Sequence, residues 1–127
     1  MAKSKGQIEA DISEAVIKFE KEYMGRGPEE TKTYILDDMI IIRLQRVLTP
    51  AEQQLAKASD ETRGRTLIKQ VRTELLENAR QLLEQIITKL TGKKVKSLHT
   101  DISTVTGERV IVFTLDSPIL LHNEGKD

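Results

Sequence analysis

Cysteine and tryptophan are both absent from this 127-residue chain, which has only two phenylalanines and two tyrosines. The lack of cysteine excludes disulfides, thiol catalysis and thiolate-bound zinc, and it fits a reducing cytoplasm. With so few aromatic rings, the chain has no stacking platform for single-stranded nucleic acid, and its core must be aliphatic. The length is that of one domain.

Net charge and long apolar runs are lacking as well. Twenty basic and twenty acidic residues cancel, so no overall field favours nucleic acid or an anionic membrane. Apolar runs such as Met39–Ile42 fall far short of the ~20 residues that span a bilayer, and no signal peptide follows the start. We therefore predict a soluble, cytoplasmic protein without direct membrane insertion, which meets a membrane only through a partner.

The first half of the chain reads as a helix followed by a hairpin. Apolar residues between 7 and 24 recur at spacings of three and four, which predicts an amphipathic helix. Gly25–Pro28 ends it, because glycine allows a positive φ and proline cannot continue a helix. Two β-rich runs, Thr33–Leu36 and Met39–Leu44, flank Asp37-Asp38 and predict a hairpin.

The second half repeats this order with a much longer helix. Thr49–Glu52 has the capping threonine, proline and glutamate of a helix start and predicts a short helix. From Glu61 an apolar helical pattern runs to Gly92, a length of roughly 45 Å. Because a small domain is narrower than this, we expect one end to project or to meet another subunit. The residues of this helical pattern, which we expect to face the core, are Leu67, Ile68, Val71, Leu75, Ala79, Leu82, Ile86 and Leu90. Val95–Ile102 and Arg109–Leu115 predict the second hairpin.

The order α-β-β-α-β-β predicts an α+β fold. A four-stranded, largely antiparallel sheet would pack against the N-terminal helix and the long central helix, both on one face. We expect a single domain over residues 7–117, a flexible N-terminus over 1–6 and a C-terminal tail over 118–127. Within the tail, the apolar segment Ile119–Leu121 could pack on the core or serve as a docking segment, and packing is the interpretation that we favour.

Two of the strands are apolar on both sides, which predicts a homodimer. Side chains alternate between the faces of a strand, and strands apolar on both faces need cover on both. Two helices on one face leave the other face uncovered, so a second copy would cover it through the sheet, the long helix or both. The expected interface residues are Met39, Ile41, Ile111 and Phe113. The alternative is a monomer with one helix on each face.

His99 and Asp101 form the only His-x-Asp pair and share one face of a strand. The carboxylate could orient the imidazole for proton transfer, or both groups could bind a metal. Two ligands are too few for zinc, and no nucleophile motif accompanies them, so we predict neither metal nor cofactor. A polar pair on a solvent or interface face is the reading that we favour.

Arg26, inside the Gly25–Pro28 segment, could offer its guanidinium to a phosphate or carboxylate. The segment follows a helix and lacks the lysine and glycine spacing of a nucleotide-binding loop, so a helix stop is the simpler interpretation. The rival hypothesis is a cleft for an anionic ligand in which Arg26, His99, Asp101 and Arg109 converge.

Four separated blocks occur in a characteristic order: Phe19–Pro28, Asp37–Met39 leading into Ile42–Leu44, Leu48–Glu52, and His99–Ser103 with Thr106–Arg109. Together they resemble the MpsC-type domain, a small bacterial family formerly described as a domain of unknown function, over about residues 5–117. The resemblance implies the small soluble component associated with a Na+-translocating, membrane-potential-generating system. It carries over positions only, a Gly-Arg-Gly-Pro corner at Gly25–Pro28 and a His-Thr-Asp segment at His99–Asp101, and no catalytic residue.

Two function hypotheses follow. The first is a non-enzymatic cytosolic accessory or regulatory module of that system, which acts by protein–protein contact with a membrane-system protein. The alternative is a small-molecule binding protein or weak enzyme for an anionic ligand.

Overall fold

The computed structural model describes residues 3–57 and 61–121. Its elements are α1 (Lys5–Tyr23), β1 (Glu30–Leu36), β2 (Met39–Gln45), α2 (Pro50–Ala56), α3 (Glu61–Thr91), β3 (Val95–Ile102) and β4 (Arg109–Leu115). The predicted α+β class and the predicted order of helices and hairpins are confirmed. Both hairpins extend the same antiparallel sheet, whose strand order is β1-β2-β4-β3.

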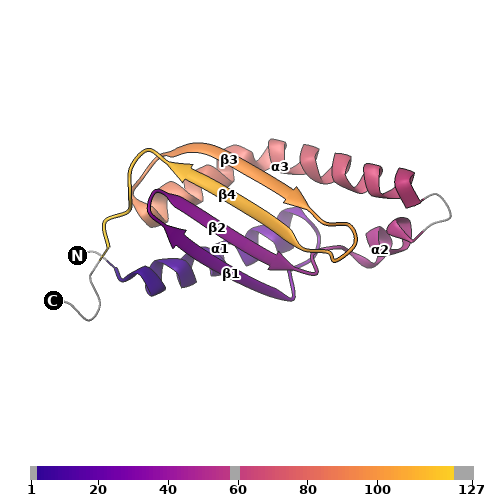
Figure 1. Ribbon diagram of the computed structural model, residues 1–127, viewed down its shortest axis with the longest axis horizontal. Helices are drawn as coiled ribbons and strands as arrows, with labels where there is room; N and C mark the ends of the chain where they lie inside the picture. Colours follow the sequence, from indigo (N-terminus) through magenta and orange to yellow (C-terminus); the bar gives the residue numbers. More distant parts are fainter. Residues whose placement is uncertain (1–2, 58–60, 122–127) are drawn as a thin grey trace.

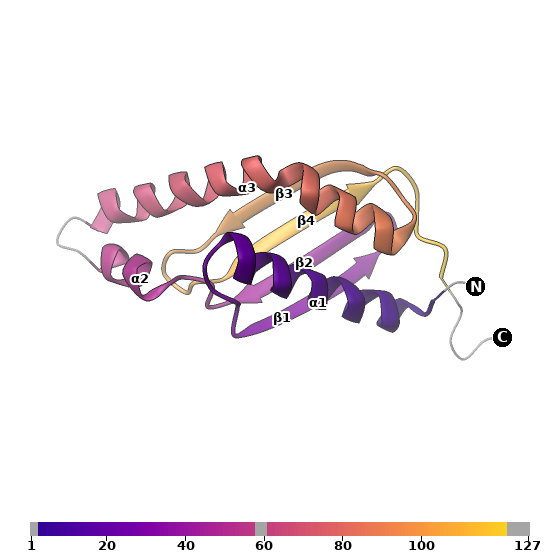
Figure 2. The ribbon, with the colours of Figure 1, turned by 180° about the vertical axis from the view of Figure 1, so that it is seen from behind.

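Helices α1 and α3 lie on the same face of the sheet, as predicted (Figures 1 and 2). Figure 1 looks onto the uncovered face, with the helices behind the strands, and Figure 2 shows the helices in front. The core between the two layers is aliphatic, with Phe19 and Phe113 as its only buried aromatic side chains among the described residues. Alternate residues of β2 and β4 point into this core, which buries Ile40, Ile42 and Phe113 completely.

Helix α1 begins at Lys5, two residues before the predicted start. The Ser4 hydroxyl accepts a hydrogen bond from the Gln7 amide at 3.1 Å and so caps the helix. Its end is as predicted, because Gly25 adopts a φ of +87° directly after the last turn. The chain then turns into β1, which starts at Glu30, three residues earlier than predicted.

Helix α3 runs past the end of the sheet, and its N-terminal part packs on α2 (Figure 1). The approach is close at Gly64, where an added Cβ would collide with the Leu55 carbonyl oxygen. Gly64 is therefore a contact between α2 and α3 that only glycine allows.

The buried side of α3 agrees with the predicted one only at Ile68 and Ala79. The residues that face the core follow helical spacing and are Ile68, Arg72, Leu76, Ala79, Leu83 and Ile87. Leu67, Val71, Leu75 and Leu82 were expected to be buried and are 36–50% exposed. Apolar residues on two adjacent stripes fitted the same periodicity, and only packing against the sheet decided between them.

Beyond β4, Ile119 is 7% exposed and belongs to the core, as expected for the apolar segment of the tail. Leu121 packs partly against the core and Leu120 is 75% exposed. The remainder of the predicted tail, residues 122–127, lies outside the described residues.

Candidate functional site

The uncovered side of the sheet is the first candidate surface, and we call it the open sheet face. Cross-strand pairing puts Tyr34, Ile41, Val112 and His99 in one row across all four strands. Ile41 and Val112 are half-buried, and Tyr34 is 42% exposed. The open sheet face comprises Lys32, Tyr34, Leu36, Met39, Ile41, Arg43, Ser97, His99, Asp101, Val110, Val112 and Thr114.

The four predicted interface residues do not form one surface. Met39 and Ile41 lie on the open sheet face, whereas Ile111 and Phe113 are 0% exposed on the helix-covered face. Strand β4 is apolar on both sides, so its pattern left open which side would meet the core. Val110 and Val112 are its residues on the open sheet face.

His99 and Asp101 share the open sheet face, as predicted. The described residues show no hydrogen bond between them. Asp101 Oδ1 instead accepts the Ile102 amide at 2.8 Å and Lys69 Nζ at 3.3 Å. The bond from the Ile102 amide, followed by that from Lys69, lowers the pKa of Asp101. Asp101 is therefore an exposed carboxylate held by α3 and its own strand.

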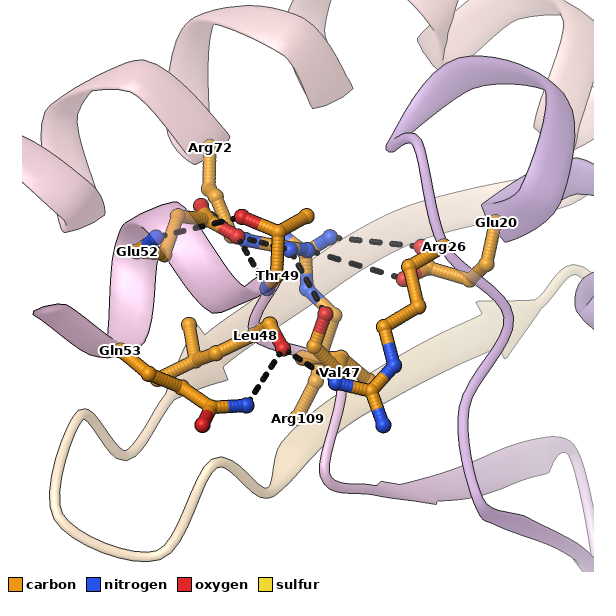
Figure 3. Close-up of polar contacts among 9 residues, drawn as sticks. All are labelled: Glu20, Arg26, Val47, Leu48, Thr49, Glu52, Gln53, Arg72 and Arg109. Atoms are coloured by element: carbon orange, nitrogen blue, oxygen red, sulfur yellow. Dashed lines mark hydrogen bonds and ion pairs between the residues drawn. The ribbon is translucent and has the colours of Figure 1, made fainter.

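The predicted four-residue ligand cleft is not formed. Arg109 lies on the opposite face of the sheet from His99 and Asp101 and is 2% exposed. Arg26 is elsewhere again: its Nη1 donates to the Leu48 carbonyl at 2.8 Å (Figure 3). Strand alternation separates Arg109 from the His-x-Asp pair, so this version of the anion-site hypothesis is wrong.

A cluster of buried charges joins three helices and β4 beneath the sheet (Figure 3). The Glu20 carboxylate, with no exposed surface, lies 3.7 Å from Arg72 Nη1 and 3.6 Å from Arg109 Nη1. Arg72 also donates to Glu52 at 2.7 and 2.9 Å and to the Val47 carbonyl at 2.9 Å. Two guanidinium groups and two carboxylates thus balance in charge.

Burial and pairing act in opposite directions on the carboxylates of this cluster. Desolvation raises the pKa of Glu20, and the charges of Arg109 and Arg72 offset only part of that rise. Desolvation also acts on Glu52, but hydrogen bonds from Arg72 and from the Thr49 amide outweigh it and lower its pKa. Burial lowers the pKa of Arg109, partly offset by Glu20. The cluster stabilises the packing of α1, α2, α3 and β4, because each of its charged side chains forms an ion pair with another member.

Sequence reasoning missed this cluster, although a signal was present. Glu20 follows Val16 by one helical turn on the apolar side of α1, and Arg72 lies midway between Ile68 and Leu76. Arg109 occupies an inward position of β4. Charged residues in phase with a core pattern indicate buried partners, because a lone buried charge is too costly. Glu52 was identified only as half of the capping box, which is present.

Arg26 contributes to a cleft of about 620 Å³ between the β2–α2 connection, α2, the start of α3 and the β3–β4 loop. Neither His99, Asp101 nor Arg109 lines it. Within residues 3–57 and 61–121, no three His, Cys, Asp or Glu side chains are grouped to hold a metal ion. None of the described helices combines the length and apolarity needed to cross a membrane.

Comparison with known proteins identifies the family of the chain and a relative. Residues 4–117 match the family described as "Na+-translocating membrane potential-generating system (MpsC)". An uncharacterized protein of Bacillus subtilis, YbcI, is 51% identical over 78 residues, which are 61% of this chain and 60% of that protein. The chain therefore spans less than two thirds of this relative. No solved structure matches the chain.

Proposed function

Because this chain belongs to the MpsC family, we propose that it is a non-enzymatic accessory component of a Na+-translocating, membrane potential-generating system. In this proposal it works at the cytoplasmic side of the membrane, through contact with a protein of that system. The observation that carries the proposal is the open sheet face, which presents apolar side chains that no described part of the chain covers.

We propose further that a second copy of the chain covers the open sheet face. Apolar side chains fill its centre. Of its two outer strands, β3 contributes Asp101, whereas β1 contributes both Lys32 and Glu30, which form an ion pair at 3.4 Å. Two sheets that pack face to face keep their strands roughly aligned. A two-fold axis parallel to the strands, between β2 and β4, then lays β1 of one copy over β3 of the other.

This arrangement is self-complementary. In the central row, Ile41 meets Val112 of the second copy and Tyr34 meets His99 of the second copy, following the observed register. In the next row, Lys32 of each copy approaches Asp101 of the other. Arg43, which is paired with Glu108 of its own copy, lies over Val110 of the other copy and borders the apolar central row. The long helices remain on the outer faces of the dimer, available to a further partner.

Light scattering tests the dimer. Ile41→Asp puts a charge into the centre of the open sheet face, which a monomer tolerates in water and a dimer would have to bury unpaired. We expect this variant to keep the wild-type circular dichroism spectrum and the mass of a monomer. Val71→Asp is the matched control, because Val71 is 50% exposed on α3, away from this face, and it should stay dimeric. A monomeric wild type, or dissociation by Val71→Asp alone, would contradict the sheet-face dimer.

Cross-linking in the native host tests the accessory role. A tagged chain, treated with a membrane-permeable cross-linker, should be recovered with a membrane-embedded protein of the translocating system, identified by mass spectrometry. Val71→Asp, the exposed-surface variant that should keep the dimer, serves as the reference. Recovery of soluble metabolic enzymes alone would count against the proposal.

A further inference from the structure

The cleft beside Arg26 concentrates positive charge in a chain whose net charge is zero. Four cationic side chains line it: Arg26 after α1, Arg46 after β2, Lys57 after α2 and Arg65 in α3. Glu29 is the one carboxylate among its described lining residues, and it lies 3.6 Å from Arg46. Without counting Arg65, the three cations Arg26, Arg46 and Lys57 already outnumber this carboxylate in the described lining.

Backbone hydrogen bonds hold the walls of this cleft. The Val47 amide donates to the Gly107 carbonyl at 3.0 Å, which fixes the β3–β4 loop against the β2–α2 connection. Gly107 has a φ of +77°, and an added Cβ would lie 3.4 Å from the Arg46 backbone. The hydrogen bond between the two backbones fixes the walls of the cleft relative to each other. Gly107 is needed for its positive φ, because an added Cβ would make only an ordinary contact.

The cleft contains N–H donors that are available to a ligand. Arg26 uses one N–H on the Leu48 carbonyl, and Gln53 donates to the same oxygen at 3.1 Å (Figure 3). The rest of the Arg26 guanidinium makes no hydrogen bond to a described residue, and Lys57 forms no ion pair with one. A guanidinium matches the geometry of a phosphate or carboxylate group, and an ammonium adds a point charge.

We propose that this cleft binds a compact polyanion, a small molecule that carries two or more phosphate or carboxylate groups. Its volume of about 620 Å³ lies within the range of small-molecule sites. No aromatic residue is among its described lining residues, so no ring there would stack on a nucleobase. The anionic groups would meet Arg26 and Arg46 on one side and Lys57 on the other. This site is distinct from the open sheet face and stands independently of the accessory role.

Isothermal titration of the full chain tests this inference, with pyrophosphate and citrate as separate probes in metal-free buffer. The phosphate probe, the carboxylate probe or both should bind, and the result names the preferred group. The double variant Arg46→Gln/Lys57→Gln removes two of the cations and should weaken binding by about tenfold or more, the worth of one charge-assisted hydrogen bond.

Lys89→Gln/Lys94→Gln is the matched control, because it removes the same charge at the opposite end of α3, outside the cleft. Binding to the control should equal that of the wild type. The absence of binding by both probes at millimolar concentration, or equal weakening by the two double variants, would overturn the inference. A parallel titration with anionic phospholipid vesicles decides whether the phosphate can come from lipid headgroups. If Arg46→Gln/Lys57→Gln loses binding to the vesicles, lipid headgroups are ligands of the cleft. If the variant binds the vesicles as well as the wild type does, the cleft is not the site for lipid headgroups.

Discussion

The buried ion pair between Glu20 and Arg109 should contribute more to stability than a shorter ion pair on the surface. Both side chains are at most 2% exposed, and their charges lie 3.6 Å apart. At an effective dielectric constant of about 20, two charges at that distance attract by about 4–5 kcal/mol. Removal of one partner leaves the other buried and costs about 3–5 kcal/mol.

A double-mutant cycle separates the attraction from the cost of burial. We expect Glu20→Gln and Arg109→Met each to lower the free energy of unfolding by about 3 kcal/mol or more. The double variant removes both charges and leaves the Arg72–Glu52 pair balanced, so it should lose about 2 kcal/mol less than the sum. This coupling is smaller than the full attraction of about 4–5 kcal/mol because Glu20 keeps Arg72 as a partner when Arg109 is removed. Urea titration at neutral pH and fixed protein concentration, followed by circular dichroism, measures all four free energies. A domain of ordinary stability, about 5–15 kcal/mol, stays folded in each variant.

The reference cycle is Arg80 with Glu84, an exposed pair at 3.0 Å on α3. Its coupling should be about 0.3–0.5 kcal/mol, as for other pairs one helical turn apart. The shorter pair should thus be the weaker one, because water screens it. A coupling between Glu20 and Arg109 no larger than that of the surface pair would refute the reasoning. It would mean that Glu20 is uncharged at neutral pH, in the direction in which burial raises its pKa.

Three further predictions concern the fold. Phe113→Ala should cost about 3–5 kcal/mol of unfolding free energy, whereas Val112→Ala, on the other side of β4, should cost far less; equal losses by urea titration would contradict the assignment of the core face. Gly64→Ala should lower the melting temperature because its Cβ meets a carbonyl of α2, whereas Gly6→Ala, in open space, should raise it slightly; calorimetry distinguishes the two. Glu52→Gln should keep the helix cap but remove a carboxylate whose pKa is lowered in the folded state. The free energy of unfolding above pH 4.5 should therefore fall, and its further decline as the pH drops below 4.5 should be shallower than in the wild type. A decline as steep as that of the wild type would contradict this.

The sequence by itself determined the local elements of this protein. Helix stops at Gly25 and Gly92, the capping box at Thr49 and the two β-rich pairs of runs each depend on neighbours within a few residues. For this reason the α+β class, the order of elements and the family could all be predicted. Boundaries shifted by two or three residues, because caps such as Ser4 act on single hydrogen bonds.

Tertiary structure decided which faces these elements bury. Strand β4 is apolar on both sides and α3 has two adjacent apolar stripes, so periodicity offered two equal choices in each, and only the opposing layer selected one. The same packing moved Arg109 away from His99 and Asp101 and toward Glu20, more than eighty residues away in the chain. It also brought four cations from four separate segments around one cleft. Contacts between residues distant in sequence depend on how whole layers meet, and no local pattern carries that information.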